Sequence, residues 1–193
     1  MRKNLTISFL YTIVTTILLG ILYPLLMTVL AQTFFSDKAN GQLVTRQGVV
    51  IGSRILGQSF TGAGYFHGRP SAAGTNGYDA SSSGASNYGP TNKKYIDRVA
   101  SDIAELQKEN PDVPAPIDLV TTSGSGLDPD ITPAAAAFQV PRIARARGIS
   151  EEKVKELIVR HAKPRQFGLL GEPRVNVFSL NLDLDKTTPS GIK

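Results

Sequence analysis

An uncharged apolar run over residues 5–31 constrains this chain more than any other feature of its sequence. A bilayer core about 30 Å thick takes roughly 20 helical residues at a rise of about 1.5 Å each, so the run is long enough to cross it. A cleaved signal peptide has a shorter apolar region of about 7 to 15 residues, and a buried core helix of a soluble protein would be shorter and would carry a polar face. We therefore expect residues 1–35 to comprise a short N-terminal stub and a retained transmembrane helix.

The charges on either side of this run predict its orientation. Arg2 and Lys3 precede it, whereas the first charges after it, Asp37 and Lys38, have opposite signs. Because positive residues favour the cytoplasmic side, we expect a single-pass protein of the cell inner membrane with a cytoplasmic N-terminus. Its main domain would then lie in the periplasm or the extracellular space.

Three residues in the run predict contact with another helix. Thr16 and Gly20 are small residues four apart, a spacing that lets a second helix approach closely, although such residues are also common in membrane helices without partners. Pro24 removes a backbone donor and is expected to kink the helix near Tyr23.

The remaining residues are enough for one domain with its own core, which we place at 36–186, with a tail at 187–193. The chain has no cysteine, so an exported domain must be stable without disulfides. Its formal net charge of +5 would suit nucleic acid, but the sequence has no RNA- or DNA-binding motif, so we expect the lipid bilayer and proteins as its partners.

Residues 57–92 are rich in Gly, Ser and Asn and have neither helical nor strand periodicity. A loop of this length is either a disordered linker or functional. Aromatic residues are spaced through it, which favours an ordered loop that packs on them and on a partner: Phe60, Tyr65, Phe66, Tyr78 and Tyr88.

The rest of the domain alternates between helices and short strands. The patterns predict a hairpin over 42–53, a helix over 92–110, and a strand over 117–120. A further helix begins after Thr132, bends at Pro141 and ends at Gly148, and another runs from Ser150 to Lys163. Alternating apolar residues predict a last strand at Phe178, Leu180, Leu182 and Leu184. We expect an α/β fold of the α+β type, extracytoplasmic, on a single N-terminal transmembrane helix.

No set of residues in the sequence predicts an active site. His67 and His161 lack the spacing of metal ligands, and the alternate acid pairs 128/130 and 183/185 are a weak signal for a cation. Gln139, Arg142 and Arg145 fall on one stripe of a helix, which suits either phosphate and acidic partners or a solvated face. We expect no catalytic residue, no metal and no cofactor bound through a motif of this chain.

Several long segments nevertheless resemble one family, the C subunit of the Kdp potassium-transporting P-type ATPase. They occupy residues 64–74, 83–92, 119–148 and 170–185, and the LYPLL of residues 22–26 fits that subunit's membrane helix. The resemblance extends from about residue 5 to 186. It implies a complex of four subunits that uses ATP to import potassium, with a channel-like, an ATP-hydrolysing and a small accessory subunit as partners.

The resemblance implies a non-catalytic accessory role, for which two views exist. In one, the subunit is a catalytic chaperone that raises the ATP affinity of the pumping subunit, with Gln139 as its nucleotide-related residue and Arg142 and Arg145 beside it. In the other, it serves assembly and sits over the external potassium entrance. A membrane-tethered periplasmic binding or enzymatic domain is the alternative from another class. The expected partner contacts are Thr16, Gly20, Pro24, Tyr65, Phe66, Arg69, Pro70, Asn87, Leu127 and Asp128.

Overall fold

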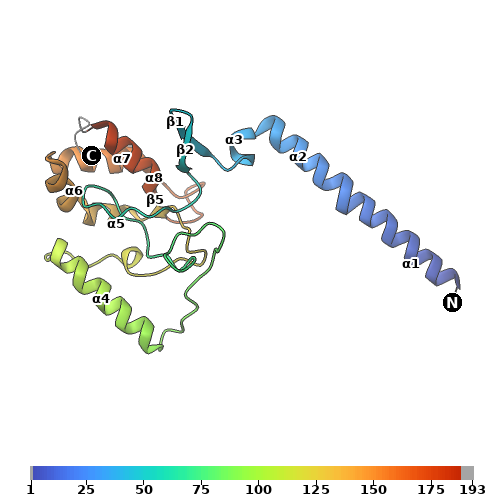
Figure 1. Cartoon of the computed structure of the whole chain (residues 1–193), viewed down its shortest axis with the longest axis horizontal. Coiled ribbons are helices and arrows are strands. Elements are labelled where there is room, and N and C mark those ends of the chain that lie inside the picture. The colour runs from blue at the N-terminus through green and yellow to red at the C-terminus, as the bar shows by residue number, and fades with distance from the viewer. Residues whose placement is uncertain (1, 188–193) are drawn as a thin grey trace. The chain divides into compact units, whose positions relative to one another are not determined.

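The computed structural model describes residues 2–187 and divides the chain into two compact units, Met1–Leu43 and Val44–Lys193 (Figure 1). The first unit is helical, and the second contains helices and two small sheets. The mixed helix-and-strand class is therefore confirmed, while the extracytoplasmic placement stays a prediction. Of the tail expected at 187–193, only Thr187 lies within the described residues, and it is the last residue of a helix.

The first unit contains one apolar helix, Arg2–Phe34, with a mean hydropathy of 2.3 and no buried residue. It consists of α1 (Arg2–Thr15), the π-helix η1 (Thr16–Leu22) and α2 (Tyr23–Phe34), and the short α3 (Ser36–Ala39) follows it. The amide of Tyr23 donates to the carbonyl of Leu18, five residues back, immediately before Pro24. The helical hydrogen bonding is thus altered where Pro24 removes a donor, and the helix is long and apolar enough to cross a membrane.

The predicted hairpin is confirmed. β1 (Leu43–Arg46) and β2 (Val49–Ser53) form a two-stranded sheet. Gln47 and Gly48, the two residues between them, both have positive φ, at 51° and 80°. Two consecutive positive φ values are typical of the type I′ turn that matches the twist of a hairpin.

A second sheet lies in the core of the second unit. β3 (Asp130–Ile131), β4 (Ala162–Lys163) and β5 (Arg174–Asn176) form it in the order β3-β5-β4, and both pairings are antiparallel. Val175 in the central strand pairs with Ile131 on one side and Ala162 on the other, and Ile131 and Val175 are buried.

Three helices pack against β5 of this sheet: α5 (Pro133–Phe138), α7 (Glu151–His161) and α8 (Val177–Thr187). A fourth, α6 (Val140–Arg147), packs on α5 and α7. The predicted capping is confirmed, since Thr132 accepts from the amide of Ala135, Gly148 ends α6 with a φ of 64°, and Ser150 caps α7. The inward faces of these helices form one core, which includes Ala135, Phe138, Ile143, Val154, Leu157, Leu180 and Leu184.

The helix expected over 92–110 is confirmed as α4 (Lys93–Glu109), capped by the side chain of Asn92. It lies on the opposite side of the second unit from α7 and α8 (Figure 1). None of its residues is fully buried, and Leu106 is among the half-buried residues that pack against the core.

Two expected strands are wrong. Residues 117–120 contain the 3-10 helix η2 (Ile117–Leu119), and the segment from Val177 onward is the helix α8. The fully buried positions in α8 include Val177, Leu180 and Leu184, which recur at helical spacing, whereas the alternating leucines suggested a period of two. Similarly, α7 ends at His161 because the next two residues pair in β4.

Residues 54–92 contain neither helix nor strand, yet they are bonded along their length to residues 125–128. The amide of Gly57 donates to the carbonyl of Leu127 at 2.7 Å, and that of Gly84 donates to the carbonyl of Ser125 at 2.9 Å. The hydroxyl of Ser71 donates to the carbonyl of Gly126 at 2.6 Å. The structure therefore agrees with the ordered-loop interpretation rather than the linker.

Replacing Gly57 with Ala tests whether the packing of the loop against residues 125–128 stabilises the fold. A Cβ at Gly57 would lie 2.6 Å from the carbonyl oxygen of Asp128, a backbone atom that cannot rotate away. We expect Gly57→Ala to lower the free energy of unfolding by about 1–3 kcal/mol, measured by circular dichroism melting. Gly124→Ala is the matched control, because nothing lies within 4 Å of its Cβ position. Equal stability of the two variants would contradict the close packing of the loop against residues 125–128.

Candidate functional site

Two buried amide side chains bind the backbone of consecutive loop residues. Asn181 of α8 accepts from the amide of Phe66 at 2.8 Å and donates to its carbonyl at 2.9 Å. Gln139, between α5 and α6, accepts from the amide of His67 at 2.8 Å and donates to its carbonyl at 3.1 Å. Each amide thus replaces one residue of a neighbouring strand, because it supplies the donor and acceptor that a sheet would supply.

Two arginines of α6 bind the carbonyls just before these residues. The guanidinium of Arg142 donates to the carbonyls of Ala63 at 2.5 Å and Tyr65 at 3.0 Å. Arg147 donates to the carbonyl of Gly64 at 2.5 Å, and its guanidinium carbon lies 4.6 Å from the centre of the Tyr65 ring. We call Gln139, Arg142, Arg147 and Asn181 together the backbone clamp.

The clamp residues are themselves neutralised or saturated within the chain. Arg142 forms an ion pair with Glu109 at 2.8 Å, and Arg147 forms one with Asp185 at 2.9 Å. Gln139 also donates to the carbonyl of Ala135 and accepts from Arg142, so both hydrogens and its oxygen are used, and it is 1% exposed. Every buried side-chain nitrogen or oxygen in the described part of the chain has a partner.

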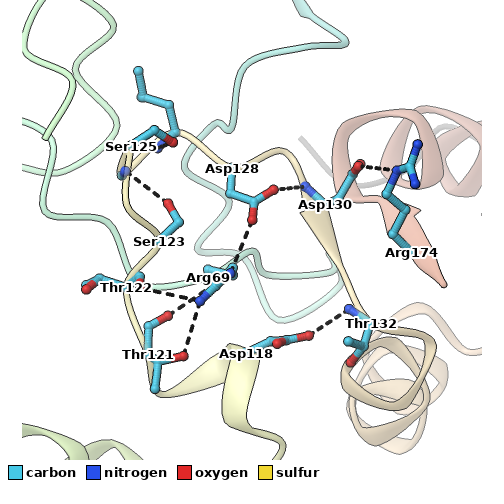
Figure 2. Close-up of polar contacts among 12 residues, drawn as sticks. Arg69, Asp118, Thr121, Thr122, Ser123, Ser125, Asp128, Asp130, Thr132 and Arg174 are labelled. Carbon is cyan, nitrogen blue, oxygen red and sulfur yellow. Dashed lines mark hydrogen bonds and ion pairs between the residues drawn. The ribbon is translucent and has the colours of Figure 1, made fainter. Parts of the chain in front are cut away.

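A second cluster, the Arg69 network, joins the loop to residues 121–128 (Figure 2). Arg69 forms an ion pair with Asp128 at 3.2 Å and donates at 3.3 Å to the carbonyls of Thr121 and Thr122. The other carboxylate oxygen of Asp128 accepts from the amide of Asp130 at 3.0 Å. The guanidinium therefore fixes the turn before β3 from the loop side.

Neighbouring carboxylates continue this network (Figure 2). Asp130 pairs with Arg174 of β5 at 3.1 Å, and Asp118 of η2 accepts from the amide of Thr132 at 2.7 Å. The cluster links the loop, the turn and the small sheet, because its charged groups bind other groups of the same chain.

Burial sets the charge state of the ionisable residues beside the clamp. Burial, together with the positive charge of Arg142, lowers the pKa of His67 below its ordinary value, so the ring is neutral at neutral pH and its Nε2 lies 3.1 Å from the carbonyl oxygen of Gly62. Burial, assisted by Asp128, raises the pKa of Tyr78, whose hydroxyl donates to the carbonyl of Arg69 at 2.5 Å. Both shifts favour the neutral form of the side chain.

A cavity of about 270 Å³ lies between the loop and α4. Its lining is mixed, with Phe60, Leu106 and Leu119 as apolar residues and His67, Glu109 and Gln139 as polar ones. Gln139 and Glu109 already bind partners of this chain there.

The structure places the expected partner contacts in three settings. Thr16, Gly20 and Pro24 are exposed on the apolar helix, and Asn87 is exposed with a φ of 53°. Phe66 and Leu127 are buried in the core of the chain, so a surface role for these two is corrected. The remaining members are half-buried: Tyr65, Arg69, Pro70 and Asp128.

The stripe of Gln139, Arg142 and Arg145 divides in the same way. Arg145 is exposed, as a solvated face requires, whereas Gln139 is buried and the side chain of Arg142 is 12% exposed. The solvated-face interpretation is therefore wrong for the first two, because the loop covers them.

The acid pairs considered as cation ligands bind protein cations instead. Asp183 accepts from Lys186 at 2.6 Å and lies 2.8 Å from His161, and these contacts, led by Lys186, lower its pKa. Among residues 2–187, no group of three or more His, Cys, Asp or Glu side chains is close enough to hold a metal ion.

Sequence reasoning missed Arg147 and Asn181, which complete the clamp. The predicted half-buried strand, with Leu180 and Leu182 inward, puts Asn181 on the exposed face, whereas a helical period over 177–187 places it among buried leucines. A polar residue on a buried helical face is a usable signal, because it needs an internal partner. Arg147 gave no such signal, since its partners lie 38 and 83 residues away.

Comparisons with known proteins find one family. Residues 5–186 match the family model described as K⁺-transporting ATPase, c chain, or KdpC. The chain is 62% identical over 189 residues to the potassium-transporting ATPase KdpC subunit of Koribacter versatilis, covering 98% of this chain and 97% of that protein. It is 57% identical over 184 residues to the subunit of the same name from Acidobacterium capsulatum, covering 95% and 98%. The resemblance noted in the sequence is confirmed.

Replacing Gln139 with Met tests whether this amide is structural. Met is of similar size but leaves the amide and carbonyl of His67 unpaired in a buried place, at about 1–3 kcal/mol for each group. We expect Gln139→Met to lower the free energy of unfolding by about 2–5 kcal/mol in thermal melts. Gln107→Met on the exposed side of α4 is the control, and a loss no greater than the control's would show that Gln139 is dispensable to the fold.

Proposed function

Because the chain belongs to the KdpC family, the c chain of the K⁺-transporting ATPase, we propose that it is a non-catalytic accessory subunit that assembles with the membrane subunits of that complex. Its partners would be the channel-like, the ATP-hydrolysing and the small accessory subunits. Potassium is the ion that the complex transports, and ATP is its energy source.

One observation carries this proposal: the charged residues of the site bind this chain itself. Arg69, Arg142 and Arg147 each contact backbone carbonyls and one carboxylate of the chain. A catalytic centre needs groups directed at a substrate, whereas these groups are directed at the loop. They hold a long irregular loop in place, and a preorganised surface loses less conformational entropy when it binds another protein.

The exposed part of that surface is the contact region we propose. Residues 81–83 and 87–91 are exposed, and Tyr88 is among the exposed large hydrophobic residues. Asn87, with its left-handed backbone, lies in the same stretch. We assign these residues, with half-buried Arg69 and Pro70, to contact with the channel-like subunit over its external entrance.

The orientation of the chain supports this side. Arg2 and Lys3 lie before the apolar helix, which favours a cytoplasmic N-terminus and an external second unit. ATP is cytoplasmic, so an effect of this chain on ATP affinity would reach the pumping subunit through conformational coupling rather than contact.

A catalytic-chaperone role with direct nucleotide contact is the second candidate. The observation that favours it is a surface groove of about 460 Å³ whose lining includes Lys108, Arg142 and the exposed Arg145. Glu105 and Glu109 line the same groove and pair with Lys108 and Arg142, which leaves Arg145 as its unpaired cation within the described part of the chain. However, a nucleotide reaching Gln139 would have to displace the loop, since all hydrogen-bonding groups of that amide bind the chain.

Replacing Gly20 with Leu tests docking of the apolar helix. The Cβ position at Gly20 has only the methyl group of Thr16 within 4 Å, at 3.8 Å, so the helix itself tolerates a side chain there. If a partner helix packs closely on this face, the larger residue prevents its approach. We expect Gly20→Leu to reduce co-purification of the other subunits in mild detergent.

Leu22→Phe is the control, because it adds bulk on the opposite side of the same helix. Loss of co-purification in both variants would indicate a general membrane defect, and intact assembly with Gly20→Leu would contradict docking through this face.

A further inference from the structure

Three large apolar side chains protrude at the turn between β4 and β5. Phe167 is 84% exposed, Leu169 is 80% exposed and Leu170 is 60% exposed. They make up the apolar tip, and none of them belongs to the core cluster. Neighbouring exposed apolar residues on one turn are a mark of an interaction site.

Backbone hydrogen bonds and an ion pair close the turn that carries the apolar tip. Gln166 and Leu170 exchange both backbone hydrogen bonds, at 2.8 and 2.9 Å, and an ion pair joins Arg165 to Glu172 at the base. Phe167 has a φ of 54°, which costs conformational free energy for a bulky residue. Such strained residues are concentrated at functional sites. A rigid exposed tip avoids the entropy cost of ordering on binding.

A basic groove lies beside β4, the strand that leads into this turn. It has a volume of about 380 Å³, and Arg54, Arg160, Lys163 and Lys186 contribute cations to its lining. Its one acidic residue, Asp183, is paired with Lys186 and His161. Lys163 belongs to β4, the strand that leads into the turn, so the groove and the apolar tip share one hairpin.

We propose that this hairpin binds the surface of a bilayer containing anionic phospholipid. The apolar tip enters the boundary between headgroups and acyl chains, and Arg54, Arg160 and Lys163 bind the lipid phosphates. This combination of exposed apolar residues with adjacent basic ones is the pattern of interfacial membrane binding.

The bilayer fits better than a partner protein on two grounds. The groove supplies several cations against a single, already paired carboxylate, which complements a negatively charged surface. The proposed membrane anchor also keeps the second unit near lipid at high effective concentration, with eight residues between Phe34 and β1. The inference rests on that anchoring and not on assembly with partner subunits.

The chain has no tryptophan, so Phe167→Trp introduces a single reporter. The full-length variant is placed in nanodiscs of phosphatidylglycerol with or without bromine on the acyl chains. We expect its emission to shift to the blue relative to detergent and to be lost in the brominated discs. Ile117→Trp, on the exposed η2 of the same unit, is the control and should keep its emission.

Charge variants test the basic groove. Arg160→Gln combined with Lys163→Gln should reduce the quenching of the emission from the Phe167→Trp reporter, and discs of neutral phosphatidylcholine should reduce it likewise. Lys153→Gln, an exposed cation elsewhere on α7, should leave the quenching unchanged. If Phe167→Trp fails to fold, Leu169→Trp serves as the same reporter.

The decisive measurement uses the assembled complex. The emission of the complex that carries the native Phe167 is subtracted from that of the complex that carries Phe167→Trp, which leaves the emission of the reporter. Quenching by brominated lipid in the complex supports the proposal. A blue-shifted emission that brominated lipid does not quench means that a partner subunit covers the tip, and an unshifted emission means that water does; either result overturns it. Failure of the chain to enter nanodiscs at all would contradict the membrane anchor, and with it the proposal.

Discussion

The fold depends on how a loop backbone is satisfied away from water without a neighbouring strand. The peptide groups of residues 63–67 run beside the core, where unpaired donors and acceptors would each cost about 1–3 kcal/mol. Two amides and two guanidinium groups of the backbone clamp supply the missing partners. The loop is consequently ordered over a length that would otherwise be a linker, and its aromatic residue Phe66 can join the core.

This arrangement explains why the most suggestive polar residues of the chain are unavailable for chemistry. Gln139 and Arg142 could be imagined beside a phosphate, yet both bind loop carbonyls, and burial lowers the pKa of Arg142 while Glu109 compensates its charge. Arg69 is used in the same manner on the other side of the loop. What remains at the surface is an ordered loop, which fits the proposed role in contact with other subunits.

Local signals in the sequence predicted the parts of the fold that local physics determines. Thr132, Ser150 and Gly148 mark helix ends through hydrogen bonds within three residues or through a backbone angle, and all three act as expected. The segment from Val177 onward was misassigned because its leucines alternate, while burial against α7 favours the helical period.

The site was harder to predict because its contacts span the chain. Asn181 binds Phe66 across 115 residues, and Gln139 binds His67 across 72, so no motif spacing records them. The run of Gly and aromatic residues did identify the region, and the helical stripe included Gln139 and Arg142, but as a possible solvated face. In the structure the loop packs over Gln139 and Arg142, so this part of the stripe is covered rather than solvated.

We propose that the clamped loop lies on the extracytoplasmic side of the membrane and influences ATP use only through partner subunits. Ser82 is exposed in the loop of this cysteine-free chain, so Ser82→Cys can be probed with an impermeant thiol reagent in intact cells. We expect the reagent to label this variant in intact cells. Protection until the cells are opened, with free labelling of the same complex in mild detergent, would place the loop in the cytoplasm and contradict the proposal.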